Sequence, residues 1–460
     1  MAQQEQQFQE QGGIATMDPS PIRRWIISKL MTMQASEKRM LKKRDKAERT
    51  RQKLGGAHVV EYFHQVDDGY SHLSAQVLSS LLKRYDIEIR PHLVGAPTGH
   101  NVAEPELLNN LGLTDAKVIA PHYGIDFPDV ESLPSADHSQ LANAILAAQS
   151  DEGFFDCVQE VSTALWQGDG NALNDLAAKY GSATEQDTAQ SVERGIARRA
   201  ELKHYSSAMF YYAGEWYWGV DRLYHLERRL QELGVDRDMG SQCVMERPET
   251  QVSEVKDDGR LTFEIYASLR SPYTAIVFDR ALKLAKDTGV NCVVRPVLPM
   301  VMRGVPATKE KGFYILFDTA REARAEGVAY GNVRDPIGQP VRNGYALYEW
   351  ACKFDKGTEF LSNFLRAVFA EGINTNKPSG LKYVVEETGL GWQEGKQQLN
   401  NSLWQQELED NRLTMYDSGL WGVPSFRLLD ESGKELLSAW GQDRLWLFAK
   451  EIKRIVEARD

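Results

Sequence analysis

The sequence predicts an α/β protein in which one architecture is used twice. Three observations support this prediction. The chain of 460 residues is too long for one ordinary domain. Each half begins with a strand, a helix and a second strand, and two short motifs recur in the same order in both halves. Arg90-Pro91 matches Arg295-Pro296 at an offset of 205 residues, and 218–223 (WGVDRL) matches 440–445 (WGQDRL) at an offset of 222.

Composition and charge exclude several classes of protein. Hydrophobic residues make up 42% of the chain, and no run approaches the roughly 18 apolar residues that a membrane-spanning helix needs. The net charge of -11 argues against binding of nucleic acid by the chain as a whole. The charge is unevenly distributed, because residues 23–53 hold 12 Lys or Arg against 3 Asp or Glu, a local charge of +9 that leaves -20 for the rest.

The N-terminal part of the chain is predicted to hold a disordered tail, residues 1–20, and a basic amphipathic helix, residues 21–55. The tail is polar and lacks the apolar run of a secretory signal, so we expect a cytoplasmic protein. Helical spacing aligns one stripe of apolar side chains: Ile22, Trp25, Ile26, Leu30 and Met33. We expect this stripe to pack on the acidic body of the protein. An anionic membrane surface or an acidic partner, bound through residues 23–53, is the alternative.

The first copy is predicted over residues 56–233, and a linker, 234–258, separates it from the second copy, 259–460. The elements expected in the first copy are a strand at 58–64, a helix at 70–85, a strand at 87–94, a helical region at 105–202 with a loop at 182–190, strands at 208–212 and 215–218, and a helix at 221–233. Those in the second are strands at 261–268 and 291–298 around a helix at 273–288, a helical insertion at 308–415, strands at 425–429 and 435–440, and a helix at 443–459. We expect the two copies to form an internal pseudo-dimer.

Cysteine and histidine positions predict neither a dithiol site nor a metal site. The four cysteines, at positions 157, 243, 292 and 352, form no CxxC pair, which argues against a dithiol oxidoreductase. Cys292 and Cys352 lie among apolar residues and are expected in the core. Strand alternation and helix phase do not bring His64 and His72 together, so no metal is expected.

Three motifs of the second copy, in order along the chain, are similar to those of a known family. They are Ser271-Pro272-Tyr273 between the first strand and the first helix, 422–426 (GVPSF), and 440–445 (WGQDRL). Residues 369–372 (FAEG) and 386–391 fit the helical insertion of the same family. On these motifs, residues 260–458 resemble the 2-hydroxychromene-2-carboxylate isomerase and kappa-class glutathione transferase family. The resemblance implies two DsbA-like thioredoxin domains, each with a helical insertion, that follow the basic N-terminal helix.

The resemblance also implies glutathione as the cofactor and Ser271 as the catalytic residue. The N-terminus of a helix favours an anion, and a serine hydroxyl can donate a hydrogen bond to a thiolate. Each of these residues also has a purely structural interpretation. Ser271 and Pro272 can be a helix cap, Pro424 a proline at the edge of a strand, and Asp443 a cap of the last helix. The family implies a cis peptide bond before Pro424 and cofactor contacts from the start of the last helix. The binding residues are then Pro272, Tyr273, Val423, Pro424, Gln442 and Asp443.

The first copy has lost most of these residues. Asp68 stands in the place of Ser271, where a carboxylate would repel a thiolate, and Ala208 stands in the place of Pro424. We therefore expect the first copy to be a packing partner without a cofactor. The alternative is a first-domain site at Asp68, Tyr70 and Asp221, with Asp68 as a general base.

The sequence thus predicts a glutathione-dependent isomerase or transferase that acts on a small organic substrate, with Ser271 stabilising the glutathione thiolate. The substrate stays undefined, because Ser268 stands where the family has an acidic residue. The alternative is a non-catalytic binding or scaffold protein of the thioredoxin fold, which docks through its first domain and its basic helix.

Overall fold

The computed structural model describes residues 18–98, 105–305, 307–399 and 401–459. The chain has two compact units, which we call the central unit (residues 41–249) and the C-terminal unit (residues 1–40 with 250–460). The predicted tail, 1–20, lies outside the described residues except for its last three. The units divide inside the predicted linker, but the basic segment 21–55 is no separate part, because it is split between the two units at residue 40.

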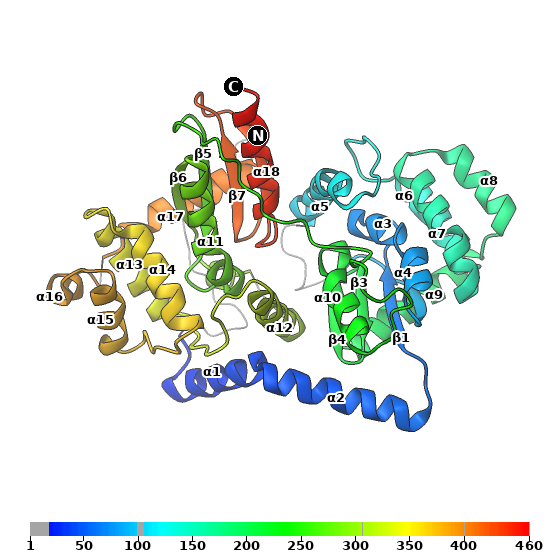
Figure 1. Ribbon diagram of the computed structural model, residues 1–460, viewed down its shortest axis with the longest axis horizontal. Helices are drawn as coiled ribbons and strands as arrows, with labels where there is room; N and C mark the ends of the chain where they lie inside the picture. Colours follow the sequence, from blue (N-terminus) through cyan, green and yellow to red (C-terminus); the bar gives the residue numbers. More distant parts are fainter. Residues whose placement is uncertain (1–17, 99–104, 306, 400, 460) are drawn as a thin grey trace. The chain divides into compact units, whose positions relative to one another are not determined.

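Each unit contains one four-stranded mixed sheet (Figure 1). The strand order is β2-β1-β3-β4 in the central unit and β6-β5-β7-β8 in the C-terminal unit. In both sheets the first pair along the chain is parallel and the other pairs are antiparallel. The strands are β1 (Val59–His64), β2 (Glu88–Leu93), β3 (Met209–Tyr212), β4 (Glu215–Trp218), β5 (Thr262–Ala267), β6 (Asn291–Pro296), β7 (Ser425–Leu429) and β8 (Glu435–Trp440). Since β1 and β5 are inner strands, they are buried almost throughout.

The strand registers correct one of the two sequence anchors. Val59 pairs with Glu88, and Thr262 pairs with Asn291, so the first strands of the two units correspond at an offset of 203, not 205. The anchor at 222 agrees with the backbone, because Gly219 N donates to Ala208 O over 2.7 Å and Gly441 N donates to Pro424 O over 3.0 Å. The Arg-Pro match was wrong because a two-residue motif can recur by chance two positions out of register.

The central unit surrounds its sheet with helices. They are α3 (Gly69–Ala75), α4 (Leu78–Arg84), α5 (Pro105–Ile119), the 3-10 helix η2 (Ala120–Tyr123), α6 (Ala136–Ala147), α7 (Asp151–Trp166), α8 (Gly170–Tyr180), α9 (Glu185–Glu201) and α10 (Gly219–Glu232). The loop predicted at 182–190 is shorter than expected. Thr184 Oγ1 accepts a hydrogen bond from Asp187 N over 3.1 Å and so caps α9, which begins at Glu185.

The C-terminal unit follows the same plan with a longer insertion. Its helices are α11 (Pro272–Thr288), η3 (Met300–Arg303), α12 (Lys309–Ala325), α13 (Gln339–Cys352), α14 (Gly357–Phe369), α15 (Pro378–Glu387), α16 (Trp392–Gly395), η4 (Lys396–Gln398), α17 (Trp404–Asp417) and α18 (Leu445–Glu457). The last helix was predicted from Asp443 but begins at Leu445, with Arg444 as its N-cap residue. Gln442 and Asp443 therefore lie in the loop that precedes it.

The basic N-terminal segment forms two helices. They are α1 (Pro21–Ala35) and α2 (Glu37–Leu54), and Ser36 separates them in an extended conformation with φ -64° and ψ 121°. The predicted packing of the apolar stripe is wrong. Ile22, Trp25 and Leu30 are 73%, 51% and 48% exposed, and α1 instead buries Arg24, Ser28 and Ala35.

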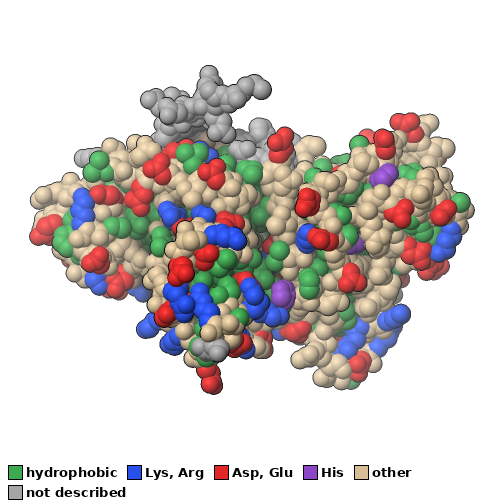
Figure 2. All heavy atoms as spheres, turned by 90° about the horizontal axis from the view of Figure 1, so that it is seen from above, with side chains coloured by type: hydrophobic (Ala, Val, Ile, Leu, Met, Phe, Trp, Pro, Cys, Tyr) green, Lys and Arg blue, Asp and Glu red, His purple; other side chains and the backbone are tan. Residues whose placement is uncertain are grey.

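None of the helices that the structure describes is long and apolar enough to cross a bilayer. On the face shown in Figure 2, acidic and basic side chains are interspersed among apolar and polar ones.

Candidate functional site

Three segments of the C-terminal unit meet at one end of its sheet. Tyr266, near the end of β5, pairs with Ser425 at the start of β7, and Ser425 pairs with Trp440 at the end of β8. The residues that follow β5, precede β7 and follow β8 are therefore neighbours in space. This sheet end holds the residues that the sequence predicts for the cofactor site.

Ser271 joins two of these segments. It is the N-cap residue of α11, where its Oγ accepts a hydrogen bond from Thr274 N over 3.1 Å. The same hydroxyl donates to Val423 O over 3.3 Å. The N-terminus of the 17-residue helix α11 thus lies beside the backbone that enters β7. Ser271 is a helix cap, as the simpler interpretation has it, and its proton is directed toward the β7 segment.

The segment before β7 has the cis peptide bond that the resemblance implied. The peptide bond between Val423 and Pro424 is cis. Ser425 Oγ donates to Gly422 O over 2.6 Å, and Gly441 N donates to Pro424 O. These contacts tie the β7 segment to the end of β8.

Tyr273 connects the site to the helical insertion. Its hydroxyl donates to Asp318 Oδ2 over 2.8 Å, and Asp318 also pairs with Arg321. The central unit repeats this contact at the offset of 203, since Tyr70 OH donates to Asp115 Oδ2 over 2.8 Å. The sequence analysis missed both aspartates, although their common spacing from the two tyrosines was available as a signal.

Gln442 faces the insertion, because its Nε2 donates to Glu322 Oε2 on α12 over 2.5 Å. The side chain is 2% exposed, and its Oε1 has no hydrogen-bond partner among the described residues. Asp443 is half-buried and lies 3.7 Å from the Arg444 guanidinium. Gln442 therefore holds α12 against the sheet end, and Asp443 is the more accessible of the two.

An ion pair next to Ser271 was not predicted. Arg270 binds Asp335 through two hydrogen bonds, Nε to Oδ1 over 2.8 Å and Nη2 to Oδ2 over 2.9 Å. Burial raises the pKa of Asp335, but the Arg270 guanidinium outweighs burial and lowers it below the ordinary value. Arg24 of α1 donates to the backbone oxygens of Asp335 and Ile337. The helix α1 therefore holds the loop at 335–337 in place, and Asp335 of that loop binds Arg270, the residue before Ser271.

A lysine lies beside the segment that leads to the cis bond. Lys311 Nζ is 5.0 Å from the centre of the Trp421 ring, and Trp421 is buried. Burial lowers the pKa of Lys311 to about 8, so part of this lysine is neutral near that pH. No sequence motif pointed to Lys311.

A comparison with protein families matches the DsbA-like thioredoxin domain to residues 262–453. Residues 262–453 form a DsbA-like thioredoxin domain. A search of curated proteins finds no match to this chain.

Several solved structures are similar to part of the chain at low identity. A 2-hydroxychromene-2-carboxylate isomerase has 18% identity and a TM-score of 0.36, over 43% of this chain and 97% of that chain. A probable DsbA oxidoreductase from Streptomyces coelicolor has 19% identity and a TM-score of 0.32, over 42% and 89%. The cytosolic disulfide reductase DsbM from Pseudomonas aeruginosa has 19% identity and a TM-score of 0.28, over 43% and 98%.

The DsbA-like domain has two cysteines, and neither lies at its candidate site. Cys292 is opposite Phe263 near the start of β5, the far end of the strand from Ser271. Cys352 is the last residue of α13. Both were predicted in the core, but each residue is exposed as a whole at the edge of its element, with only its sulfur turned inward. Burial of the sulfur raises the pKa of Cys292 to about 11 and also raises that of Cys352, so neither is a ready thiolate.

Each residue proposed for a first-domain site has a hydrogen-bond partner in the central unit. Asp68 caps α3, and its Oδ2 accepts from Ser71 N over 3.1 Å and from Ser71 Oγ over 2.8 Å. Burial raises the pKa of Asp68 to about 6. Tyr70 OH is directed to Asp115, and Asp221 accepts from Tyr123 OH over 2.8 Å. Asp68 thus caps its own helix, and both the packing role and the first-domain site stay predictions.

The buried histidines of the central unit have polar partners of their own. His64 Nδ1 lies 2.9 Å from Tyr62 OH, and His72 Nδ1 lies 2.8 Å from Ser162 Oγ. Burial lowers the pKa of His64 to about 3 and that of His72 to about 4. Over the described residues, no three His, Cys, Asp or Glu side chains are grouped as a metal ion would need.

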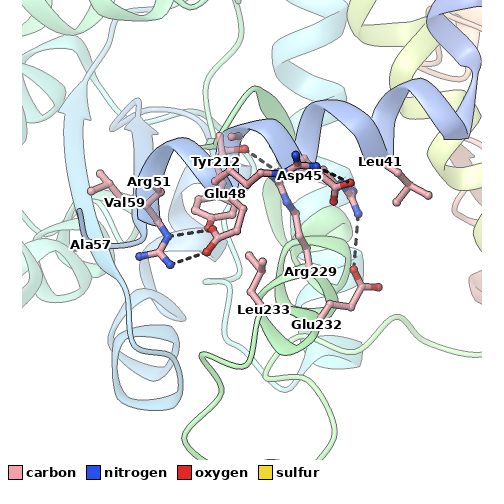
Figure 3. A pocket seen from close by; sticks show the side chains of 14 residues that line it. Leu41, Asp45, Glu48, Arg51, Ala57, Val59, Tyr212, Arg229, Glu232 and Leu233 are labelled. Carbon is pink, nitrogen blue, oxygen red and sulfur yellow. Dashed lines mark hydrogen bonds and ion pairs between the residues drawn. The ribbon is translucent and has the colours of Figure 1, made fainter. Parts of the chain in front are cut away.

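A pocket of about 460 Å³ lies in the central unit between α2, the start of β1 and the end of α10 (Figure 3). Arg44 binds Glu215 through two hydrogen bonds of 2.6 and 2.8 Å, and Arg51 binds Glu48. Arg229 donates to Tyr212 O over 2.9 Å. Of these contacts, the pair of Arg44 with Glu215 attaches α2 to β4.

Proposed function

We propose that the DsbA-like domain binds glutathione at Ser271 and uses its thiolate to isomerise or conjugate a small organic substrate. The observation that carries the proposal is the place of the Ser271 hydroxyl, at the start of α11 and within 3.3 Å of the backbone next to the cis bond. A thiol has to come from a cofactor, since the two cysteines of the domain lie elsewhere.

The start of α11 can stabilise a thiolate in two ways. Unpaired N–H groups and the helix dipole favour an anion at a helix N-terminus. The hydroxyl of Ser271 donates over 3.3 Å in the structure, which is a long O–H···O distance, so little is lost when it turns to a sulfur anion. It keeps accepting from Thr274 N as it turns. Both effects lower the pKa of the bound thiol.

The remaining binding residues take different parts in this proposal. Val423 precedes the cis bond, where an extended peptide can pair with its backbone. Asp443 suits the ammonium group of the γ-glutamyl end, since a carboxylate attracts it. Gln442 is buried against Glu322, so it positions α12 and does not contact the cofactor directly.

The reaction needs no oxidant. The thiolate forms a C–S bond with an electron-poor carbon of an unsaturated substrate, and the electron pair of the double bond moves to a conjugated carbonyl oxygen. Rotation about the resulting single bond and return of the electrons expel the thiolate unchanged, which is an isomerisation. Protonation of the adduct instead yields a conjugate, which is the transferase outcome.

We also propose that the two units arose by tandem duplication. The common offset of 203 residues supports this, because it relates both the first strands and the Tyr-Asp contacts of the two units.

The function is tested by calorimetric titration of the full chain with reduced glutathione, and with S-methylglutathione as the control. Both ligands should bind, but only reduced glutathione should show thiolate absorbance in the ultraviolet below the usual thiol pKa. A crystal soaked with glutathione should show it at Ser271. Absence of binding, or glutathione found in the central unit alone, would refute the proposal.

A further inference from the structure

The helix α1 turns its apolar side to solvent and its polar side to the protein. Five exposed apolar residues lie on one face of the helix and form the stripe of Ile22, Trp25, Ile26, Leu30 and Met33. Two polar side chains, Arg24 and Ser28, are buried on the opposite face. A surface helix of a globular protein has the reverse arrangement, so the stripe is an unusual exposed apolar surface.

Specific contacts hold α1 in this orientation. Arg24 is 1% exposed and binds Asp18, with 2.9 Å between Nη2 and Oδ1, besides the two backbone oxygens of the 335–337 loop. Ser28 Oγ accepts from Asp335 N over 3.2 Å, and Thr32 Oγ1 accepts from Val333 N over 3.0 Å. If α1 rolled to bury its stripe, Arg24 would lose these partners. The exposed stripe is therefore a fixed feature of the C-terminal unit.

The small apolar contact at the end of α1 leaves the stripe uncovered. Ala35 packs with Leu316 and Ala320 of α12, and Met31 and Tyr330 lie against this cluster. None of these residues belongs to the stripe. In Figure 1, α1 lies along the outside of its unit, next to α12.

The charge around the stripe indicates what can cover it. Pro21–Ala35 contains three basic residues and no acidic one, and Arg23 and Lys29 are exposed. The wider segment 23–53 carries +9. Pairing with the same stripe of a second copy would bring two such positive segments together, which is unfavourable. An anionic bilayer offers acyl chains for the stripe and negative headgroups for the basic residues.

We propose that α1 is an in-plane anchor that docks this protein on the surface of an anionic membrane. The stripe enters the boundary between headgroups and acyl chains, with Trp25 at the level that indole side chains favour. Arg23 and Lys29 reach lipid phosphates beside it. This docking does not depend on glutathione, because it uses the outer face of α1 and not the sheet end at Ser271.

The test is flotation of the full chain with vesicles of phosphatidylcholine alone and of phosphatidylcholine mixed with phosphatidylglycerol. The wild-type protein should float with the mixed vesicles only, and added salt should weaken its binding. The triple variant Ile22→Ser/Trp25→Ser/Leu30→Ser should bind at least about tenfold more weakly, since it removes three large apolar side chains from the stripe. Arg23→Glu/Lys29→Glu should also lower the partition coefficient by about tenfold or more.

The control variant is Met239→Ser/Leu403→Ser, which changes two apolar side chains that are 80% and 68% exposed elsewhere. It should float like wild type, and so should Ser271→Ala. Circular dichroism checks that every variant is folded. The proposal is overturned if the mixed vesicles bind no protein, or if the triple variant binds as well as wild type. A dimer that depends on the stripe, without vesicle binding, also overturns it in favour of a second copy.

Discussion

The Ser271 hydroxyl offers the most direct test of the proposed chemistry, because Ser271→Ala removes one donor and one acceptor and leaves the helix backbone in place. A hydrogen bond to a charged group contributes about 1.5–3 kcal/mol. Since one pKa unit corresponds to about 1.4 kcal/mol, the pKa of the bound glutathione thiol should rise by about 1 to 2. The N-terminus of α11 still favours the anion, so binding of glutathione should persist.

The same substitution removes the cap of α11, where Ser271 Oγ accepts from Thr274 N over 3.1 Å. Loss of a serine cap costs about 0.5–2 kcal/mol of stability. The control is Ser150→Ala, because Ser150 caps α7 by accepting from Gly153 N over 3.2 Å. Both variants should lose a comparable free energy of unfolding in urea, but only Ser271→Ala should raise the pKa of the bound glutathione thiol.

The assay is the ultraviolet absorbance of the thiolate, followed against pH with the protein saturated by glutathione. The midpoint should lie higher in Ser271→Ala than in wild type and in Ser150→Ala. If the midpoint is the same in all three proteins, the hydroxyl does not contact the sulfur. Ser271 would then be a helix cap alone.

Three further predictions concern the central unit and α1. Burial raises the pKa of Glu61, but hydrogen bonds from Arg198 and His92 outweigh burial and lower it from 4.5 to about 2. The stabilisation by ionised Glu61 is therefore complete above pH 4.5 and is lost as the pH falls toward 2. In Glu61→Gln, the free energy of unfolding should no longer show this loss between pH 4.5 and 2. Gly195→Ala should destabilise the central unit by about 1–3 kcal/mol in urea, because the new Cβ would lie 1.9 Å from Leu93 O. Arg24→Met should speed hydrogen exchange in α1, because about 2–4 kcal/mol of buried hydrogen bonding is lost.

Two of these predictions have a control within the chain. Gly312→Ala should be stabilising by about 0.5–1 kcal/mol, since Gly312 is helical and its new methyl group would meet no atom within 4 Å. Arg23→Met, at the exposed neighbour of Arg24, should leave exchange in α1 unchanged. The reasoning fails if Gly195→Ala is as stable as Gly312→Ala, if α1 keeps its protection in Arg24→Met, or if Glu61→Gln unfolds in acid like wild type.

The strands and the repeated plan were predictable because their signals are local. Inner strands such as β1 and β5 are buried on both faces, so their sequences are runs of apolar and aromatic residues. The match between 218–223 and 440–445 gave the correct correspondence of the two units, because six residues define this motif. The match at Arg90-Pro91 was wrong because the residue that corresponds to Arg295 in the structure is His92. Each of these two side chains binds a glutamate on the neighbouring strand: His92 lies 2.9 Å from Glu61, and Arg295 binds Glu264.

The site was predictable only in part. The cis bond before Pro424 is present as the resemblance implied, and the Ser271 hydroxyl donates to Val423 O beside it. Gln442 was placed at the start of a helix, but it precedes α18 and faces Glu322. Asp318, Asp335 and Lys311 were missed, because each comes to the site from an insertion far along the chain. No local pattern marks such a position.

The sequence by itself determined the α/β class, the repeated order of strands and helices along the chain, the absence of a paired-cysteine motif and the serine at the start of α11. These depend on residue type and short-range spacing. Only the tertiary structure decided which face of α1 is exposed. Periodicity defines a stripe but not its direction, and the direction follows from contacts between Arg24 and a loop 311 residues away. A buried guanidinium with oxygen partners outweighed the burial of the apolar stripe, and this leaves the protein with an exposed surface that the pattern alone predicted to be covered.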